Sequence, residues 1–236
     1  MSTTVNNNVT YLGLGDVIDG RLFIDLVDTA CKWATVAKKT HFTFYGCTLD
    51  TAALSNNLLK PLKGYLSILR SFQRVLSFKE VCWNSVDKAK LSSLIKAVQH
   101  SFATVSGFSG GACYLIASKV VHLSPHFRIL NLTKHITSTA NNVLKIALDA
   151  SNMWELYQQG SENSQSNKWR WCDHILSIWN QTLSIVSTIF IRLAPEFGFA
   201  LFAATQLSPF TLAAISTCEN IGKIAQAVAC KWSGLA

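Results

Sequence analysis

A stripe of large apolar residues between positions 58 and 76 constrains the fold more than any other feature of the sequence. Its members recur at alternating steps of four and three residues: Leu58, Leu62, Tyr65, Leu69, Phe72 and Leu76. This spacing places them on one face of an α-helix, because a helical turn holds about 3.6 residues. Basic residues repeat on the opposite face, at Lys60, Lys63, Arg70 and Arg74. The segment therefore predicts a basic amphipathic helix, and Pro61 is tolerated in its first turn.

Apolar periodicity predicts helices in other parts of the chain as well. Steps of three and four residues indicate a helix at about 20–38 and another at about 130–158. A third helix is expected to start near Asp87 and to contain 97–118, which is long enough to cross a bilayer core and holds no formal charge. The dipeptide Ser124-Pro125 should end it. Since no segment shows convincing strand alternation, the expected fold class is all-α, a helical bundle.

The carboxy-terminal part of the sequence is the most membrane-like. Two charge-free runs, 174–191 and 197–218, flank a short turn that contains Pro195. They predict an apolar helical hairpin whose lobes are transmembrane candidates and which enters and leaves a membrane on one side. Pro209 also allows a shorter last helix that starts at this residue, and both divisions stay open. Tryptophan and arginine precede the hairpin, a pairing typical of the lipid headgroup level: Trp169, Arg170 and Trp171.

These segments predict a division of the chain into four parts. Residues 1–15 are polar and should be disordered, 16–158 should form the helical bundle, and 159–168 should be a polar linker. Residues 169–236 should form the membrane-associated apolar hairpin.

Composition and charge favour a lipid partner. Charged residues make up only 14% of the chain, against about 25% in an average soluble domain. The net charge is +8, and the basic surplus is concentrated between Lys60 and Lys96. Such a surface suits anionic lipid, whereas nucleic-acid binders usually carry more charge, so no nucleic acid is expected. The candidate lipid-binding residues are Lys60, Lys63, Arg70, Arg74, Trp169, Arg170 and Trp171. The competing interpretation of 58–76 is a helix whose stripe packs into a bundle and whose basic face is solvated.

Few residues suggest catalysis or the binding of a metal or cofactor. The seven cysteines include no Cys-x-x-Cys pair, and Pro125 interrupts the spacing of His122 and His126, so no metal site is expected. No phosphate-binding loop or dinucleotide fingerprint is present, so no cofactor is expected either.

The string from Gly107 to Gly111 matches the nucleophile elbow of α/β-hydrolases, with Asp149 and His174 following in hydrolase order. Without strands to hold an elbow, a small-residue helix face is the competing interpretation. A serine hydrolase is kept as a remote alternative, and the expectation is a protein that is not an enzyme.

Two stretches resemble the inclusion-membrane (Inc) proteins of chlamydiae, in particular those of the class I accessible protein type. They are Ser109-Gly110-Gly111-Ala112-Cys113-Tyr114-Leu115, and the passage from Ile175-Leu176-Ser177-Ile178-Trp179 through Arg192-Leu193-Ala194-Pro195 into an Ala-rich helix. The resemblance implies a type III secreted virulence effector that resides in the host vacuole (inclusion) membrane of an intracellular bacterium. It also implies action through lipid or through a protein partner, which the sequence does not identify; self-association is a further expectation.

The order of segments is similar to a second family, the peroxisomal membrane-elongation proteins of peroxin-eleven type. Both have an opening helix at a Gly-Arg pair (here Gly20-Arg21), a basic amphipathic helix, two middle helices, a polar linker and a closing apolar pair. This resemblance implies membrane shaping at the peroxisome and is the alternative function.

Overall fold

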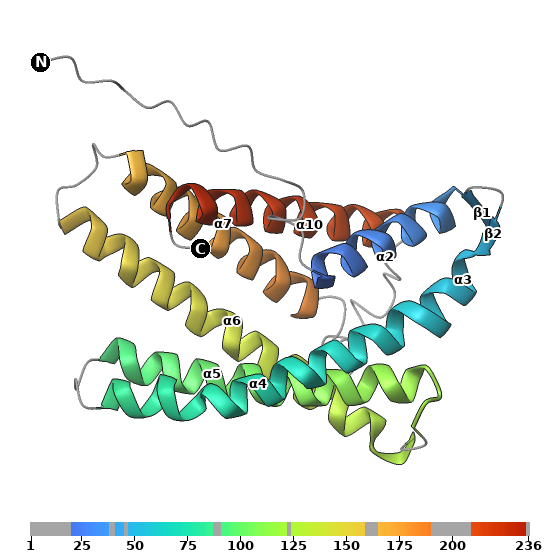
Figure 1. The fold of residues 1–236 in the computed structure, drawn as a ribbon, viewed down its shortest axis with the longest axis horizontal. Helices are drawn as coiled ribbons and strands as arrows, with labels where there is room; N and C mark the ends of the chain where they lie inside the picture. The colour runs from blue at the N-terminus through green and yellow to red at the C-terminus, as the bar shows by residue number, and fades with distance from the viewer. Residues whose placement is uncertain are drawn as a thin grey trace, which may run out of the picture.

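The computed structural model describes residues 20–37, 41–44, 47–86, 91–121, 124–158, 165–189 and 209–234. Within them the chain is an all-α helical bundle, as expected, with one small hairpin (Figure 1). Strands β1 (His41–Phe44) and β2 (Cys47–Asp50) pair antiparallel, with His41 opposite Asp50. The hairpin was not expected, because four residues per strand are too few to show an alternating pattern.

The helices follow in an order close to the predicted one. They are α2 (Gly20–Val36), α3 (Thr51–Ala53), the π-helical turn η1 (Leu54–Leu59), α4 (Lys60–Val86), α5 (Leu91–Ala117), the 3-10 turn η2 (Ser124–His126), α6 (Phe127–Gln158), α7 (Gln165–Ser187) and α10 (Pro209–Trp232). The turn η2 falls at the predicted Ser124-Pro125 break.

The helices from α4 to α10 pack mainly on their neighbours in sequence, whereas α2 packs mainly on a helix distant in sequence. Helix α5 lies between α4 and α6, and α7 lies between α6 and α10. Figure 1 shows α6 running obliquely from the α4–α5 pair to α7. Helix α2 packs on α10 and also contacts α4, so it connects the two sides of the molecule.

Small residues bring α4 and α5 close together. The Ser67 hydroxyl donates to the Gly107 carbonyl over 3.0 Å, and Ser71 is fully buried in the same contact. A Cβ on Gly107 would overlap the Ser71 hydroxyl, and one on Gly111 would overlap a neighbouring isoleucine. The string 107–111 is therefore a helix-packing face within α5, and the strand-to-helix turn of a nucleophile elbow is absent there.

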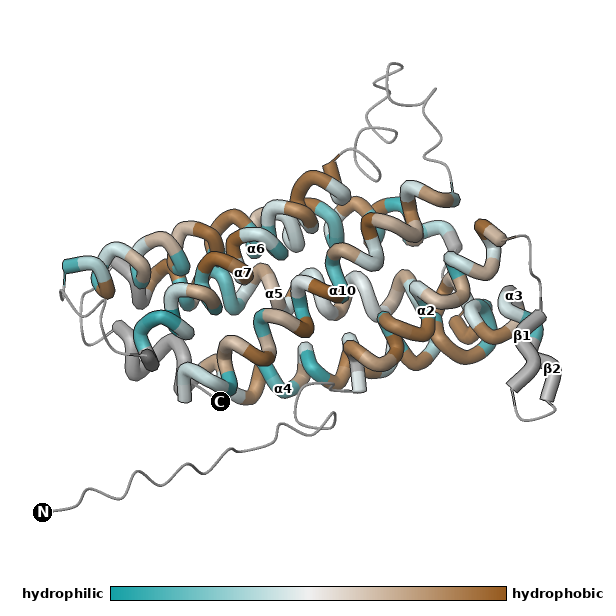
Figure 2. Tube along the Cα trace, turned by 90° about the horizontal axis from the view of Figure 1, so that it is seen from above, coloured by the Kyte–Doolittle hydropathy of each residue, from teal (hydrophilic) through white to brown (hydrophobic). Residues whose placement is uncertain are grey.

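Large apolar side chains lie on the outside of the bundle. All members of the 58–76 stripe are exposed, from 39% for Leu62 to 81% for Leu76. On α6, Ile136, Val143 and Trp154 are exposed as well. Figure 2 shows hydrophobic positions recurring beside hydrophilic ones along the long helices.

Small and polar side chains occupy the space between the helices. Buried polar residues include Ser71, Asn142, Asp149, Ser177 and Asn220. The interpretation in which the stripe packs into a bundle is therefore wrong for this structure. The reason is that α4 meets its neighbours through its small and polar face, which permits a closer approach than the leucines would.

The carboxy-terminal helices lie side by side, α7 against α10. Helix α10 begins at Pro209, as in the shorter of the two predicted divisions. Helix α7 begins at Gln165, inside the predicted linker. The predicted segment 1–15 and the first part of the predicted lobe 197–218, residues 197–208, lie outside the described residues. Within the described part of the chain, no helix combines the length and apolar content needed to cross a membrane.

Candidate functional site

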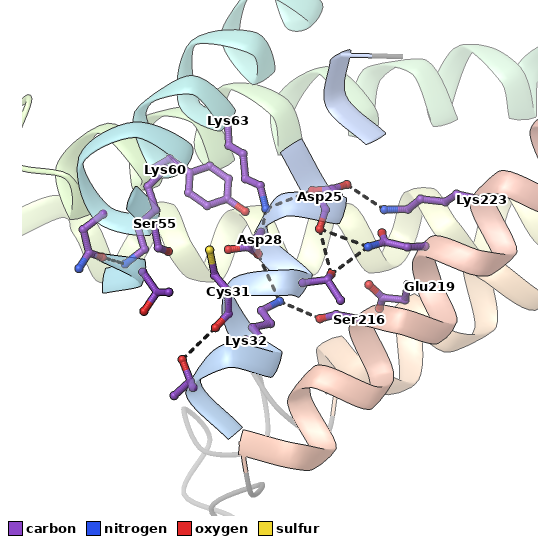
Figure 3. Close-up of a pocket in the computed structure, with 16 residues that line it drawn as sticks. Asp25, Asp28, Cys31, Lys32, Ser55, Lys60, Lys63, Ser216, Glu219 and Lys223 are labelled. Carbon is purple, nitrogen blue, oxygen red and sulfur yellow. Dashed lines mark hydrogen bonds and ion pairs between the residues drawn. The ribbon is translucent and has the colours of Figure 1, made fainter. Parts of the chain in front are cut away.

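The most highly charged contact in the described structure joins three helices at α2 (Figure 3). Lys63 of α4 places its Nζ atom 3.1 Å from Asp25 Oδ1 and 3.1 Å from Asp28 Oδ2. Lys223 of α10 lies 3.0 Å from the other oxygen of Asp25. Lys32 pairs with Asp28 at 3.3 Å and donates to a serine of α10. The two carboxylates of α2 thus connect helices that are far apart in sequence.

Helical spacing and burial explain the strength of this network. Asp25, Asp28 and Lys32 follow at steps of three and four residues, so they share one face of α2. The Lys63 side chain is only 16% exposed. Burial lowers the pKa of Lys63, but the Asp25 and Asp28 carboxylates raise it by more, so the pKa lies above its ordinary value of 10.5. Lys63 therefore stays charged in the folded protein at neutral pH.

Neutral hydrogen bonds extend the same contact. Asn220 of α10 donates to the Thr29 hydroxyl over 2.9 Å and to the Asp25 carbonyl over 3.2 Å. A cavity of about 560 Å³ opens beside the network and is also lined by Lys60 and Glu219. On its wall, Asp25 and Asp28 pair with the three lysines of the network. Glu219 accepts a hydrogen bond from Ser187. This arrangement suits helix–helix attachment better than the capture of a charged ligand.

The four candidate lipid-binding residues of α4 line cavities between the helices. Lys63 belongs to the network above, and Lys60 Nζ donates to Asn56 Oδ1 over 2.5 Å beside the same cavity. Arg70 and Arg74 line a second cavity, and Arg74 Nη1 donates to the Ala103 carbonyl over 2.9 Å. The basic face of α4 therefore points toward other helices, opposite to the exposed apolar stripe. Lipid binding by these residues stays a prediction.

The other candidate lipid-binding residues lie at a different end of the molecule. Trp169 stacks on Trp232 of α10, with ring centroids 5.9 Å apart. The Arg170 Nε atom is buried without a hydrogen-bond partner in the described structure, and Trp171 is half-buried. Figure 1 shows the start of α7 at the opposite end of the bundle from the start of α4. The structure therefore does not bring the two groups together.

A buried polar cluster joins α6 to α7. Asp149 Oδ1 lies 2.9 Å from His174 Nδ1, and Asp149 Oδ2 accepts a hydrogen bond of 2.5 Å from Ser177. The sequence pointed to Asp149 and His174, but Ser109 lies on α5 and Ser177 completes the cluster. Sequence reasoning missed Ser177, although its spacing of three residues from His174 on a helix could have indicated a shared face.

The order of these three groups differs from that of a hydrolase. In a catalytic triad the imidazole lies between the hydroxyl and the carboxylate, where it takes the hydroxyl proton. Here the Asp149 carboxylate lies between Ser177 and His174, so the Ser177 proton points to the carboxylate. This geometry gives the hydrolase alternative no support.

No group of three or more histidine, cysteine, aspartate or glutamate side chains gathers as metal ligands within the described residues. Comparison with protein-family models, curated proteins and solved structures finds no significant match to the chain. The resemblances to the inclusion-membrane and peroxin-eleven families therefore stay predictions.

Proposed function

We propose that this chain is a non-enzymatic, membrane-associated helical protein that buries outward apolar side chains at a lipid surface. The observation that supports this proposal is the orientation of α4. Its stripe of leucine and aromatic side chains is exposed, whereas Lys63, Ser67 and Ser71 face neighbouring helices. Soluble monomers rarely expose contiguous apolar patches above a few hundred Å².

Insertion into lipid would remove the free-energy cost of exposing this apolar surface to water. Burying apolar area contributes about 25 cal/mol per Å², and an amphipathic helix lying at the acyl boundary gains it along its whole apolar face. Helix α4 has 27 residues, which corresponds to a length of about 40 Å. A stripe along much of such a helix offers a continuous area for insertion.

Aromatic and basic side chains at the opposite end of the bundle support a second lipid contact. Trp154 and Tyr157 stack at the end of α6 and are largely exposed. Trp169 and Trp232 stack where α7 begins and α10 ends, beside the exposed Lys168. Tryptophan and tyrosine favour the headgroup level of membranes. This agrees with the lipid contact proposed for Trp169, Arg170 and Trp171.

The inclusion-membrane resemblance supplies the biological setting that we propose, an effector acting at a host vacuole membrane through lipid or a protein partner. The amphipathic character of α4 favours membrane shaping of peroxin-eleven type as the second candidate, because a helix inserted into one leaflet expands that leaflet.

Flotation of the purified full-length chain with neutral phosphatidylcholine vesicles tests the membrane proposal. The wild type should float, and a variant with Leu62→Gln, Leu69→Gln and Leu76→Gln should float about tenfold less, because these leucines of the stripe are exposed and the variant loses apolar area at the surface. Methionine at the same three positions is the matched control and should float like the wild type. A wild-type chain that stays at the bottom, or a glutamine variant that floats like it, would contradict the proposal.

A further inference from the structure

Helices α4, α5 and α6 turn polar faces toward a common groove. Two cavities of about 240 Å³ and about 660 Å³ lie along it, and both are lined by Arg74, Ala103 and Asn141. Because they share these wall residues, the two cavities are adjacent parts of one groove. It runs from Lys134 at one end to Lys96 and Asn152 at the other.

Helical periodicity brings the lining residues to the groove. On α6 they follow at steps of three and four positions: Lys134, Ser138, Asn141, Lys145, Leu148 and Asn152. Helix α5 contributes Lys96, Gln99 and His100 on one of its faces, and α4 contributes Arg70 and Arg74. The groove is thus built from regular helices that hold its side chains at fixed separations.

The lining of the groove carries a strong positive surplus. Among the described residues, five lysine and arginine side chains line it, against the single carboxylate of Asp149. That carboxylate already accepts a hydrogen bond from Ser177 and contacts His174. No ion pair joins Lys96, Lys134 or Lys145 to a carboxylate within the described residues. The α2 network differs in this respect, since Lys32, Lys63 and Lys223 each meet an aspartate there.

Neutral polar groups lie among the cations. Within the described residues, the buried Asn141 Oδ1 atom has no hydrogen-bond partner, although the amide nitrogen of this side chain donates to Asn142. The amides of Gln99, Asn152 and Gln181 also line the larger cavity. Side-chain amides can both donate to and accept from hydroxyl groups, whereas phosphates need donors and positive charge. The groove offers partners for both chemistries.

We propose that the groove between α4, α5 and α6 binds a polyol that carries several phosphate groups. Arg70, Arg74 and Lys134 receive one phosphate, and Lys96 and Lys145 receive another further along the groove. The amides between them bind hydroxyl groups. The ligand is either the phosphorylated headgroup of a membrane lipid or a free polyol polyphosphate, and the site does not depend on whether the apolar stripe enters lipid.

Calorimetric titration of the full-length chain in a neutral detergent with inositol hexakisphosphate tests the site. Binding should be saturable with one ligand per chain and should weaken as salt is added, because phosphate contacts are screened. The double variant Lys134→Gln, Lys145→Gln should bind about a hundredfold more weakly, at about tenfold for each charged contact. Lys119→Gln with Lys231→Gln removes the same charge from exposed positions outside the groove and should leave the affinity within about twofold of wild type.

A conservative variant separates binding from folding. Lys134→Arg with Lys145→Arg keeps both charges and should retain most of the affinity, while circular dichroism compares the helix content of all variants. Binding that does not saturate, or equal weakening by both glutamine double variants, would overturn the site.

Vesicles identify the source of the ligand. Phosphatidylinositol bisphosphate added to phosphatidylcholine vesicles should increase flotation of the wild type but not of Lys134→Gln, Lys145→Gln if the ligand is a lipid headgroup. If inositol hexakisphosphate binds in the groove but phosphatidylinositol bisphosphate does not increase flotation, the ligand is a free polyol polyphosphate. Flotation with pure phosphatidylcholine reports on the apolar stripe and the aromatic contact but not on the groove, so the membrane proposal and the anion site can fail independently.

Discussion

A Cβ atom added to Gly111 of α5 would lie 2.9 Å from the carbonyl oxygen of Gly64 on α4. Real Cβ atoms do not approach a backbone oxygen so closely, so the two helices would have to separate. The absence of side chains at Gly64 and Gly111 therefore fixes the distance between α4 and α5.

Alanine at Gly111 should destabilise the fold by about 1–3 kcal/mol, the usual cost of overpacking a close contact. Gly110→Ala is the matched control on the same helix, because its Cβ would meet only the flexible Lys134 side chain at 3.5 Å. Alanine has the higher helix propensity, so this control should be neutral or stabilising by up to about 1 kcal/mol. Denaturant titration followed by circular dichroism measures the stability of both variants. Equal denaturation midpoints for Gly111→Ala and Gly110→Ala would show that Gly111 does not set the separation of α4 and α5.

Removal of the Lys63 charge should leave Asp25 and Asp28 without their most buried cation. Lys63→Met should cost about 2 kcal/mol of folding free energy, less than the 3–5 kcal/mol of a fully buried pair because water still reaches these groups. Lys60→Met is the control one helical turn earlier and should cost less than about 0.5 kcal/mol. Adding Asp28→Asn to Lys63→Met should restore part of the lost stability, because it removes the repulsion between the Asp25 and Asp28 carboxylates. If the double variant is no more stable than Lys63→Met, this repulsion does not cause the loss.

Alkaline pH should remove the contribution of Lys63. Its pKa is raised in the folded state above the ordinary 10.5. A raised pKa means that the folded state holds this proton more tightly, so the stabilisation is complete below pH 10.5 and declines as pH rises through the folded pKa. The difference in denaturation midpoint between wild type and Lys63→Met should therefore narrow above pH 10.5. A difference that stays constant to higher pH would show that Lys63 acts by packing alone.

Cysteine reactivity should follow burial. Burial, with a smaller effect from Asp28, raises the pKa of the Cys31 thiol, and burial raises the pKa of Cys113 against the opposing charge of Lys134. Cys172 and Cys218 are exposed. Since the thiolate is the reactive form, iodoacetamide near neutral pH should label Cys172 and Cys218 first and Cys31 and Cys113 only after unfolding. Peptide mapping by mass spectrometry checks this order, and early labelling of Cys113 would contradict the packing of α5.

The helices could be predicted from sequence, but the direction of their faces could not. The predicted helices at about 20–38 and 130–158 correspond to α2 (Gly20–Val36) and α6 (Phe127–Gln158). Periodicity predicts which residues share one face of a helix, because this depends only on residues that are close together in the sequence. Which face meets another helix depends on partners elsewhere in the chain, such as Gly111 for Gly64. The stripe of α4 therefore points outward although its spacing was interpreted correctly.

The candidate site was predictable to a similar degree. Asp149 and His174 were noted for their order along the chain, and the structure joins them. Ser177 was missed because serine is common on helices and carries no signal by itself. The contact of Lys63 with Asp25 was missed because both residues fit amphipathic helices individually, and only the tertiary arrangement pairs them.

The position of α2 against α10 has a consequence for the timing of synthesis. Asp25 and Lys223 are separated by 198 positions along the chain. At ribosomal rates of about 5–20 residues per second, Asp25 waits roughly 10–40 s before Lys223 has been made. During that interval α2 can meet α4 but not α10, and its contacting face stays available to chaperones. Late closure of this kind makes α2 dependent on protection until α10 has been made.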